Sequence, residues 1–455
     1  GLGKTGVVAI LKNGSSDRAV GLRADIDALP MTEHNHFAHA SQHPGKMHAC
    51  GHDGHTAMLL GAAKYLAKHR NYDGTVYLIF QPAEEGGGGA REMIKDGLFE
   101  KFAMEAVFGA HNWPGMAAGQ FALKSGPCFA SSNEFRITIR GKGAHAALPH
   151  NGIDPVPVAC QMVQAFQTII SRNKKPIDAG VVSVTMIHAG EATNVVPDFC
   201  ELQGTVRTFS IEVLDLIEAR MKQIAEHTCA AYDATCEFEF VRNYPPTINS
   251  APEAEFARQV MNDIVGADHV MVQEPTMGAE DFAYMLLARP GAYCFIANGD
   301  GSHRDGGHGT GPCMLHNPSY DFNDALLPLG ALAAGFGFAL GGAQAQTPAG
   351  AADEAWPSWP MPSALPTAMT NLRCSTGSPG WPGRWRASTR PRTRGFRPAA
   401  LTLNCWTAAS RTSPNRAWRA CRPSASSWTA GSHPRAAPAN GPRGARTRCR
   451  SASRA

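Results

Sequence analysis

The stretch 48–55 gathers side chains that can bind a metal ion. Its eight residues include three imidazoles, a thiol and a carboxylate. Thiolate and imidazole are good ligands for borderline transition metals, and two glycines let the backbone turn tightly around an ion. A structural zinc finger would need two ligand pairs at short spacing. We therefore expect an open, catalytic metal site in which Cys50 and His52 are ligands and distant residues supply the rest.

Two adjacent acids form a second candidate group. Glu84 and Glu85 follow the predicted strand 75–80 within Gln-Pro-Ala-Glu-Glu-Gly, and three more glycines come next. Neighbouring side chains of an extended chain point apart. We therefore expect different roles for the two acids, with one binding metal and the other holding a proton. A charged turn is the alternative.

Two further histidines are placed where ligands are expected. His111 follows the predicted strand 106–110, and His316 begins the sequence His-Asn-Pro. A ligand role is the favoured interpretation for His111, because other strand ends also carry ligand-type groups. His316 is the natural last ligand. His303 and His308 compete with it from a glycine-rich stretch.

A pair of aspartates follows the predicted strand 19–23. Asp25 and Asp27 are two residues apart and would face the same way on a strand. Open α/β sheets place their sites at the carboxyl ends of strands. The pair could orient a ligand or cap the loop, and we favour an orienting role for Asp27.

Predicted strands and helices, which would position these side chains, alternate along the chain. Apolar periodicity predicts strands at 7–11, 19–23, 75–80, 106–110 and 292–297, and helices at 56–69, 90–96 and 251–265, with another helix opening at 278–282. This alternation predicts an α/β catalytic domain that is discontinuous in sequence. It would comprise residues 1–121 and 246–342.

Residues 122–245 have a different pattern. Predicted elements are strand 134–140, helix 154–171, strands 181–188 and 199–209, helix 210–232 and strand 236–241. This β-α-β-β-α-β order is typical of a compact ferredoxin-like α+β domain. The segment carries His145, Asn194 and Arg207. An imidazole, an amide and a guanidinium can together hold a carboxylate and an oxyanion, although each could also be structural.

Composition divides the chain again near its end. The net charge is +4, but residues 343–455 contain 17 Arg, no Lys and seven of the eight Trp. We expect this tail to be disordered or non-native, with a nucleic-acid-binding arm as the alternative. The remainder is acidic, so no nucleic-acid partner is expected. No apolar run reaches about 18 residues, which argues against a membrane span. Scattered cysteines indicate reduced thiols in the cytoplasm.

These motifs together resemble the aminoacylase-like amidohydrolases of the two-metal metallopeptidase group, which includes hippurate hydrolase and hydrolases of indole-acetyl-amino acid conjugates. The resemblance extends to about residue 329 and is carried by the stretches 21–30, 50–55, 81–86, 143–147 and 316–318. It implies a metallopeptidase-type catalytic domain with a central mixed sheet flanked by helices, and an inserted lid and dimerisation domain. Two departures are expected: the family's first helices are missing, and the tail replaces its final helix.

The resemblance also implies roles for individual residues. Glu84 would be the general base, and His145 would stabilise the oxyanion, reaching the active site of a homodimer partner from the lid. Asn194 and Arg207 would bind the substrate carboxylate. Two divalent ions of zinc, manganese, cobalt or nickel would be held by Cys50, His52, Glu85, His111 and His316.

The expected activity is metal-dependent hydrolysis of N-acyl amino acids, such as N-benzoyl amino acids, to a carboxylate and a free amino acid. One alternative is a dipeptidase or other exopeptidase of the same group. Another is an inactive, truncated metal-binding pseudoenzyme that serves only as a dimerising module.

Overall fold

The computed structural model describes residues 1–304 and 306–338. Four hydrogen-bonded sheets are formed by these residues, the largest with seven strands and the next with four. The predicted tail 343–455 lies outside the described residues. Within the described ranges, every helix is too short or too polar to cross a lipid bilayer.

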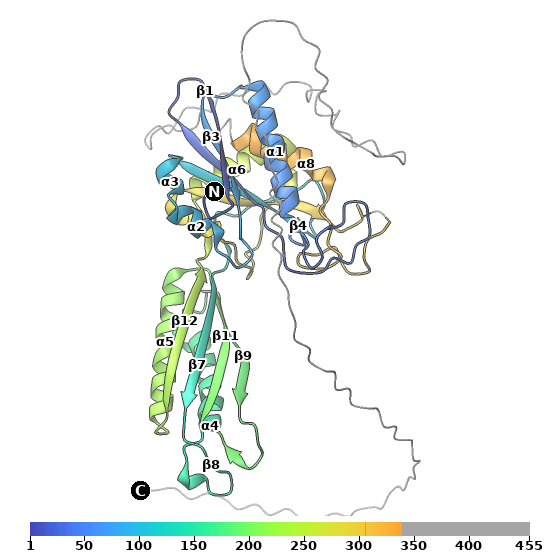
Figure 1. The fold of residues 1–455 in the computed structure, drawn as a ribbon. Helices are drawn as coiled ribbons and strands as arrows, with labels where there is room; N and C mark the ends of the chain where they lie inside the picture. Colours follow the sequence, from blue (N-terminus) through green and yellow to red (C-terminus); the bar gives the residue numbers. More distant parts are fainter. Residues whose placement is uncertain (305, 339–455) are drawn as a thin grey trace, which may run out of the picture. The chain divides into compact units, whose positions relative to one another are not determined.

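The seven-stranded sheet has the order β1-β3-β2-β4-β15-β5-β14. Its strands are β1 (Val7–Asn13), β2 (Ala19–Asp25), β3 (Gly74–Gln81), β4 (Ala106–Pro114), β5 (Phe121–Ala122), β14 (Val270–Met271) and β15 (Gly291–Gly299). Three of these strands, β1, β3 and β4, are labelled in Figure 1. β3, β2, β4 and β15 are parallel, whereas β1 and β5 pair antiparallel with β3 and β15. The sheet is therefore mixed, as predicted, and the carboxyl ends of its four central strands share one edge.

Helices cover both faces of this sheet. Successive side chains of a strand point to opposite faces, and both faces of β3 are apolar: Leu78 packs into one hydrophobic core and Ile79 into another. Each face therefore needs helices to cover it. The first core contains side chains of α1 (His52–His69), α6 (Ala251–Val265) and the segment after α8 (Leu327–Leu332). The second contains side chains of α2 (Gly89–Lys95), α3 (Leu98–Lys101) and α7 (Ala283–Ala288). β2 is buried on both faces along its whole length.

The segment 132–244, called the inserted segment below, builds its own antiparallel sheet of order β12-β7-β11-β9. Its main elements are β7 (Ser132–Arg140), α4 (Pro155–Thr168), β9 (Gly180–Ala189), β11 (Phe199–Thr208), α5 (Ile211–Ala230) and β12 (Thr235–Tyr244). Their order is the predicted β-α-β-β-α-β, around a separate hydrophobic core. Two short strands, β8 (Ala144–His145) and β10 (Val195–Val196), pair with each other. A division into catalytic and lid domains remains a prediction.

Two helix starts differ from the predicted ones. α1 begins at His52, four residues earlier than expected, because Gly51 adopts a left-handed conformation with φ 84° and the chain turns into the helix there. His52 therefore lies in the first turn of a helix and not in a loop. α7 begins only at Ala283, because the side chains of the preceding Glu280 and Asp281 are buried and hydrogen-bonded, as described below.

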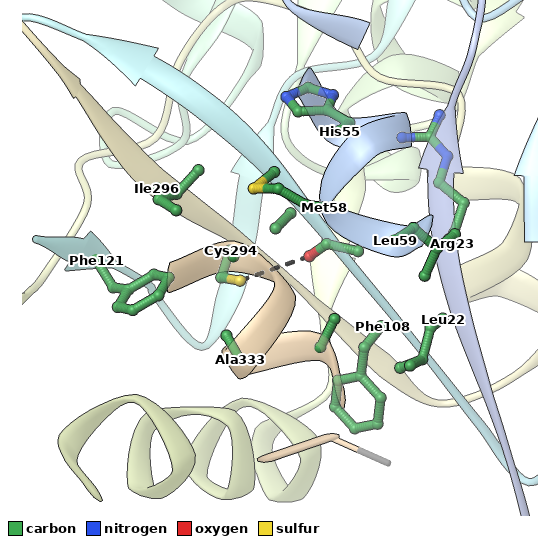
Figure 2. Close-up of a pocket in the computed structure, with 14 residues that line it drawn as sticks. Leu22, Arg23, His55, Met58, Leu59, Phe108, Phe121, Cys294, Ile296 and Ala333 are labelled. Carbon is green, nitrogen blue, oxygen red and sulfur yellow. Dashed lines mark hydrogen bonds between the residues drawn. The ribbon is translucent and has the colours of Figure 1, made fainter. Parts of the chain in front are cut away.

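An apolar cavity of about 40 Å³ lies within the first core. Figure 2 shows Leu22, Met58 and Phe108 around it, and the Cys294 thiol donating a hydrogen bond to the Gly109 carbonyl. The predicted metal ligands do not line it. The predicted ligands lie instead at the carboxyl edge of the sheet.

Candidate metal centre

All five predicted ligands meet at the carboxyl edge of the seven-stranded sheet. Cys50 Sγ lies 3.4 Å from His111 Nε2, and His316 Nε2 lies 3.3 Å from Glu85 Oε1. The ligand atoms of Cys50, Glu85 and His316 all lie within 4.8 Å of one another, as do those of His52, Glu84 and Glu85. Glu85 belongs to both groups, so the two form one continuous cluster.

Unsatisfied polar atoms in this cluster fit a metal ion. Among the described residues, His52 Nε2 and Glu85 Oε1 are buried without a hydrogen bond of good geometry, although Asp25 Oδ2 lies 3.6 Å from the first and His316 Nε2 lies 3.3 Å from the second. Buried polar atoms in proteins nearly always have a partner, so two such atoms in one cluster are unusual. A set of sulfur, nitrogen and carboxylate donors suits divalent transition metals. The residues present therefore fit the predicted ions.

The electrostatics of the cluster also favour a cation. Burial, reinforced by the carboxylates of Glu85 and Glu84, raises the pKa of the Cys50 thiol well above its usual value. Burial lowers the pKa of His111 well below its usual value, which leaves a neutral imidazole with a lone pair. A nearby cation would offset the cost of gathering a thiolate and carboxylates in a buried place.

Asp27 orients two parts of the cluster. Its backbone carbonyl lies 3.0 Å from His52 Nδ1, and its carboxylate Oδ1 lies 3.4 Å from the same atom. Although burial opposes it, the carboxylates of Asp25 and Asp27 raise the pKa of His52 to about 9 in the metal-free protein. In the neutral tautomer that keeps its proton on Nδ1 beside Asp27, the Nε2 lone pair would be available to an ion. The Asp27 carboxylate also accepts the N–H groups of Glu84 and Glu85, at 3.1 and 3.0 Å. The geometry agrees with the predicted orienting role.

Backbone hydrogen bonds fix the loops that carry Cys50 and His316. Asn112 Nδ2 donates to the Cys50 carbonyl at 2.6 Å, and Tyr320 Oη donates to Asn112 Oδ1 at 2.7 Å. The His316 N–H donates to the Ala49 carbonyl at 2.8 Å. His316 itself has φ 61°, a left-handed conformation that non-glycine residues rarely adopt. The backbone bond to Ala49 therefore holds His316 beside the loop of Cys50, and its half-exposed imidazole meets Glu85.

Glu84 lies against a buried network of charges that sequence reasoning missed. Arg23 donates to Asp25 Oδ2 at 2.9 Å and to Glu280 Oε1 at 2.8 Å. It also donates to Asp281 Oδ1 at 3.2 Å, and the Asp281 N–H donates to Glu84 Oε1 at 3.3 Å. Burial, followed by the carboxylates of Glu280 and Asp281, raises the pKa of Glu84 well above its usual value. A carboxylate in this position readily accepts a proton.

The family of the chain follows from the comparison with known proteins. The model for peptidase family M20/M25/M40 matches residues 21–326. The chain belongs to this family. It is 41% identical over 327 residues to hippurate hydrolase of Campylobacter jejuni, covering 72% of this chain and 82% of that protein.

Two further relatives support the M20 assignment. N-acetyl-L-cysteine deacetylase of Bacillus subtilis is 42% identical over 301 residues, covering 66% of this chain and 71% of the relative. The fold is similar to the crystal structure of a dinuclear metal-binding peptidase of the M20 family from Bacillus subtilis, with TM-score 0.63 and 32% identity. That match covers 75% of this chain and 84% of the other.

Within this M20 fold, His55 joins the ligand loop to the buried network. His55 Nδ1 lies 2.6 Å from Asp25 Oδ1, and His55 Nε2 accepts the Asn112 N–H at 2.9 Å. Both nitrogens are therefore engaged, although His55 lies close to His52 and His111. The two competing histidines are placed elsewhere, since His303 Nε2 lies 3.3 Å from the Asp321 carbonyl and His308 is exposed.

The three predicted residues of the inserted segment do not join the cluster. His145 is exposed in β8, and the Asn194 carbonyl accepts the Ala146 N–H at 3.0 Å beside it. Arg207 lies near the other end of β11, where its guanidinium donates to the Asn133 and Val206 carbonyls. Among the described residues, the structure gives no hydrogen bond from these three side chains to the metal-site cluster.

One sequence signal could have drawn attention to two of the missed residues. Glu280 and Asp281 are adjacent acids, as are Glu84 and Glu85, but the sequence pattern around them indicates only the start of a helix. Both are buried, with exposures of 2% and 0%. Buried acids need a positively charged partner, and Arg23 donates hydrogen bonds to both of them in the structure.

Proposed function

We propose that the chain hydrolyses the amide bond of N-acyl amino acids, releasing a carboxylate and a free amino acid. The single observation that carries this proposal is the convergence of five ligand-type side chains beside a buried acid, Glu84. The names of the M20 relatives agree, because one is a hippurate hydrolase and another a deacetylase of N-acetyl-L-cysteine.

Two divalent ions would be held by the side chains of Cys50, His52, Glu85, His111 and His316. Bound ions would supply Lewis acidity that polarises the scissile carbonyl and lowers the pKa of water to about 7. Zinc, manganese, cobalt and nickel all suit this donor set, and metal availability decides among them.

Glu84 is the proposed general base. It is adjacent to a ligand, 7% exposed, and held by the Asp281 N–H on Oε1. From this position it would take a proton from the attacking water and later pass it to the leaving amine. The network of Arg23 and its acids would keep this carboxylate from turning away.

His145, Asn194 and Arg207 are proposed to bind and polarise the substrate. Arg207 and Asn194 would hold the α-carboxylate of the amino acid, and His145 would stabilise the oxyanion. Their absence from the cluster supports a second copy as the source of His145. β7 runs nine residues, about 27 Å, from Ser132, which pairs with Tyr244, to Arg140. His145 lies beyond that far end.

An exposed strand edge supports the predicted homodimer. β9 is the last strand of its sheet and pairs on one side only, with β11. Its Met186 and Ile187 are 42% and 54% exposed. An edge strand with exposed apolar side chains is a template for pairing with another chain. The eight cysteines of the described ranges are all free, which supports the predicted cytoplasmic location.

Metal analysis combined with a substrate panel tests the proposed function. The full chain should contain about two divalent ions and hydrolyse hippurate and N-acetyl amino acids faster than dipeptides at equal concentration. Faster turnover of dipeptides would favour an exopeptidase of the same family. Bound metal without hydrolysis of any acyl amino acid would favour the inactive metal-binding module.

A further inference from the structure

The loop that carries the two glutamates contains unfavourable and flexible backbone positions. Ala83 has φ 54°, and Gly86 and Gly88 have φ 82° and 63°. A left-handed conformation costs about 1–2 kcal/mol at a non-glycine residue, and glycines favour no single conformation. Two hydrogen bonds within the loop, from the Gly86 N–H to the Glu84 carbonyl and from the Gly89 N–H to the Ala83 carbonyl, offset part of this cost. Contacts from outside the loop add to them.

Tyr244 makes two of these contacts with one hydroxyl group. Its Oη donates to the Glu84 carbonyl at 2.6 Å and accepts the Gly88 N–H at 3.1 Å. The hydroxyl thus ties both ends of the turn between Glu84 and Gly88. Tyr244 is 7% exposed, so water does not readily replace these bonds.

Tyr244 is also the residue at which the inserted segment ends. It is the last residue of β12, and it pairs with Ser132, the first residue of β7. Its neighbour Asn243 is held from α7, because the Tyr284 hydroxyl donates to the Asn243 carbonyl. The rings of Tyr244 and Tyr284 pack edge to face at 6.2 Å. One side chain therefore joins the exit of the inserted segment to the loop of the proposed base.

We propose that Tyr244 is a positioning residue for Glu84, and that it fastens the Glu84–Gly88 turn to the end of the inserted segment. This inference rests on the proposed function of Glu84. The residue does not touch the reacting atoms; it acts through the backbone that presents the carboxylate.

The test compares Tyr244→Phe with Tyr284→Phe in the full-length, metal-loaded chain. Each variant removes one hydroxyl from the same aromatic pair, but only the first removes bonds to the Glu84–Gly88 turn. Hydrogen exchange is measured by mass spectrometry on peptides spanning residues 82–93. Metal content, thermal unfolding, kcat and KM for hippurate are measured on the same samples.

Tyr244→Phe should speed amide exchange at the turn about tenfold, because the Gly88 N–H loses its acceptor. It should lower kcat about 10- to 100-fold with little change in KM or metal content. Tyr284→Phe should leave both exchange at the turn and kcat near the unsubstituted values, with a similar small loss of thermal stability.

Unchanged exchange at the turn in Tyr244→Phe would overturn the proposal. So would equal losses of kcat in the two variants, since a general structural effect would then suffice. Faster exchange with an unchanged kcat would refute the positioning of the base. If the unsubstituted chain hydrolyses no acyl amino acid, the proposed function fails, while the exchange measurement still decides whether Tyr244 fastens the turn.

Discussion

Glu84 and Glu85 are adjacent in sequence but have different surroundings. Glu84 is 7% exposed and faces Glu280 and Asp281 through the buried network, whereas the buried Glu85 Oε1 faces His316 Nε2 at 3.3 Å without a hydrogen bond of good geometry. The first environment suits a group that gains and loses a proton, and the second suits a metal ligand. The roles expected from the alternation of side chains agree with this geometry.

Glu84→Gln should separate metal binding from catalysis. The amide keeps the size of the side chain but cannot take a proton, so kcat for hippurate should fall by about 10²–10⁴-fold. Metal content, measured by mass spectrometry of the purified chain, should remain unchanged. Glu85→Gln is the matched control and should lose metal. Retained turnover in Glu84→Gln with metal bound would remove Glu84 from the base role.

Asp27→Ala should weaken metal binding without removing a ligand. The substitution removes the carboxylate that lies beside His52 Nδ1 and accepts the N–H groups of the glutamate pair. Loss of such an orienting partner typically costs about 10–100-fold in metal affinity. Competition with a chromophoric chelator measures the change. Asp17→Ala changes an exposed acid before the amino end of β2 and should have no effect, so equal affinities in the two variants would contradict the role given to Asp27.

Residue types and spacing indicate the proposed ligands, because metal chemistry limits which side chains can bind an ion. Cys50, His52 and His111 could therefore be chosen from the sequence alone. The pairing of Arg23 with Glu280 could not be predicted, because the two residues are 257 positions apart and nothing in the local pattern indicates that both are buried. Their pairing is a property of the folded sheet.

At the scale of elements, strand ends and one tight turn place the ligands. The parallel register of β2, β3 and β4 places Asp25 level with Gln81 and Arg23 level with Gly109, so the residues at the ends of these strands meet at one edge. Periodicity was enough to predict these strands. It could not predict that α1 begins at His52, because that start depends on the conformation of Gly51.

Gly51→Ala tests whether the turn before α1 is essential. A Cβ at this position would lie 2.4 Å from Asn112 Nδ2 and 2.6 Å from Tyr320 Oη, the pair that holds the Cys50 carbonyl. Gly45 is the matched control, since it also has a positive φ, 74°, but open space around a Cβ. Both variants bear the left-handed strain of about 1–2 kcal/mol.

Only Gly51→Ala should also displace Asn112, and it should therefore lose metal and show a distinctly lower melting temperature than Gly45→Ala. Metal content and thermal unfolding of the two purified variants provide the measurement. Equal melting temperatures and equal metal content would show that the turn tolerates a side chain and that the contacts around Asn112 are not needed.

At the scale of the whole molecule, the inserted segment carries residues that its own sheet holds away from the cluster. The element order of this segment was predictable from periodicity, because each helix and strand buries one face against its own core. Its use by a second copy was implied by family resemblance alone. A local sequence pattern cannot indicate whether a side chain acts in the active site of its own chain or in that of a second copy.

Mixing two inactive variants tests this arrangement. Glu84→Gln supplies a normal His145, and His145→Ala supplies a normal Glu84. If His145 acts on the partner's site, co-refolding equal amounts should restore about a quarter of the original activity, because half of the dimers are mixed and each has one complete site. Sedimentation of the mixture confirms the dimer. If each site uses its own His145, mixing restores nothing.

β4 gains its second parallel neighbour late in synthesis. β15 is made some 180 residues after β4, on the order of ten seconds or more at the usual pace of a ribosome. In that interval the inserted segment can fold, because its four long strands pair only with one another. Until β15 is made, the edge of β4 that will pair with it has no partner strand, and the apolar Val107 and Phe108 of β4 lie along that edge. A nascent chain at this stage should therefore be a substrate for chaperones.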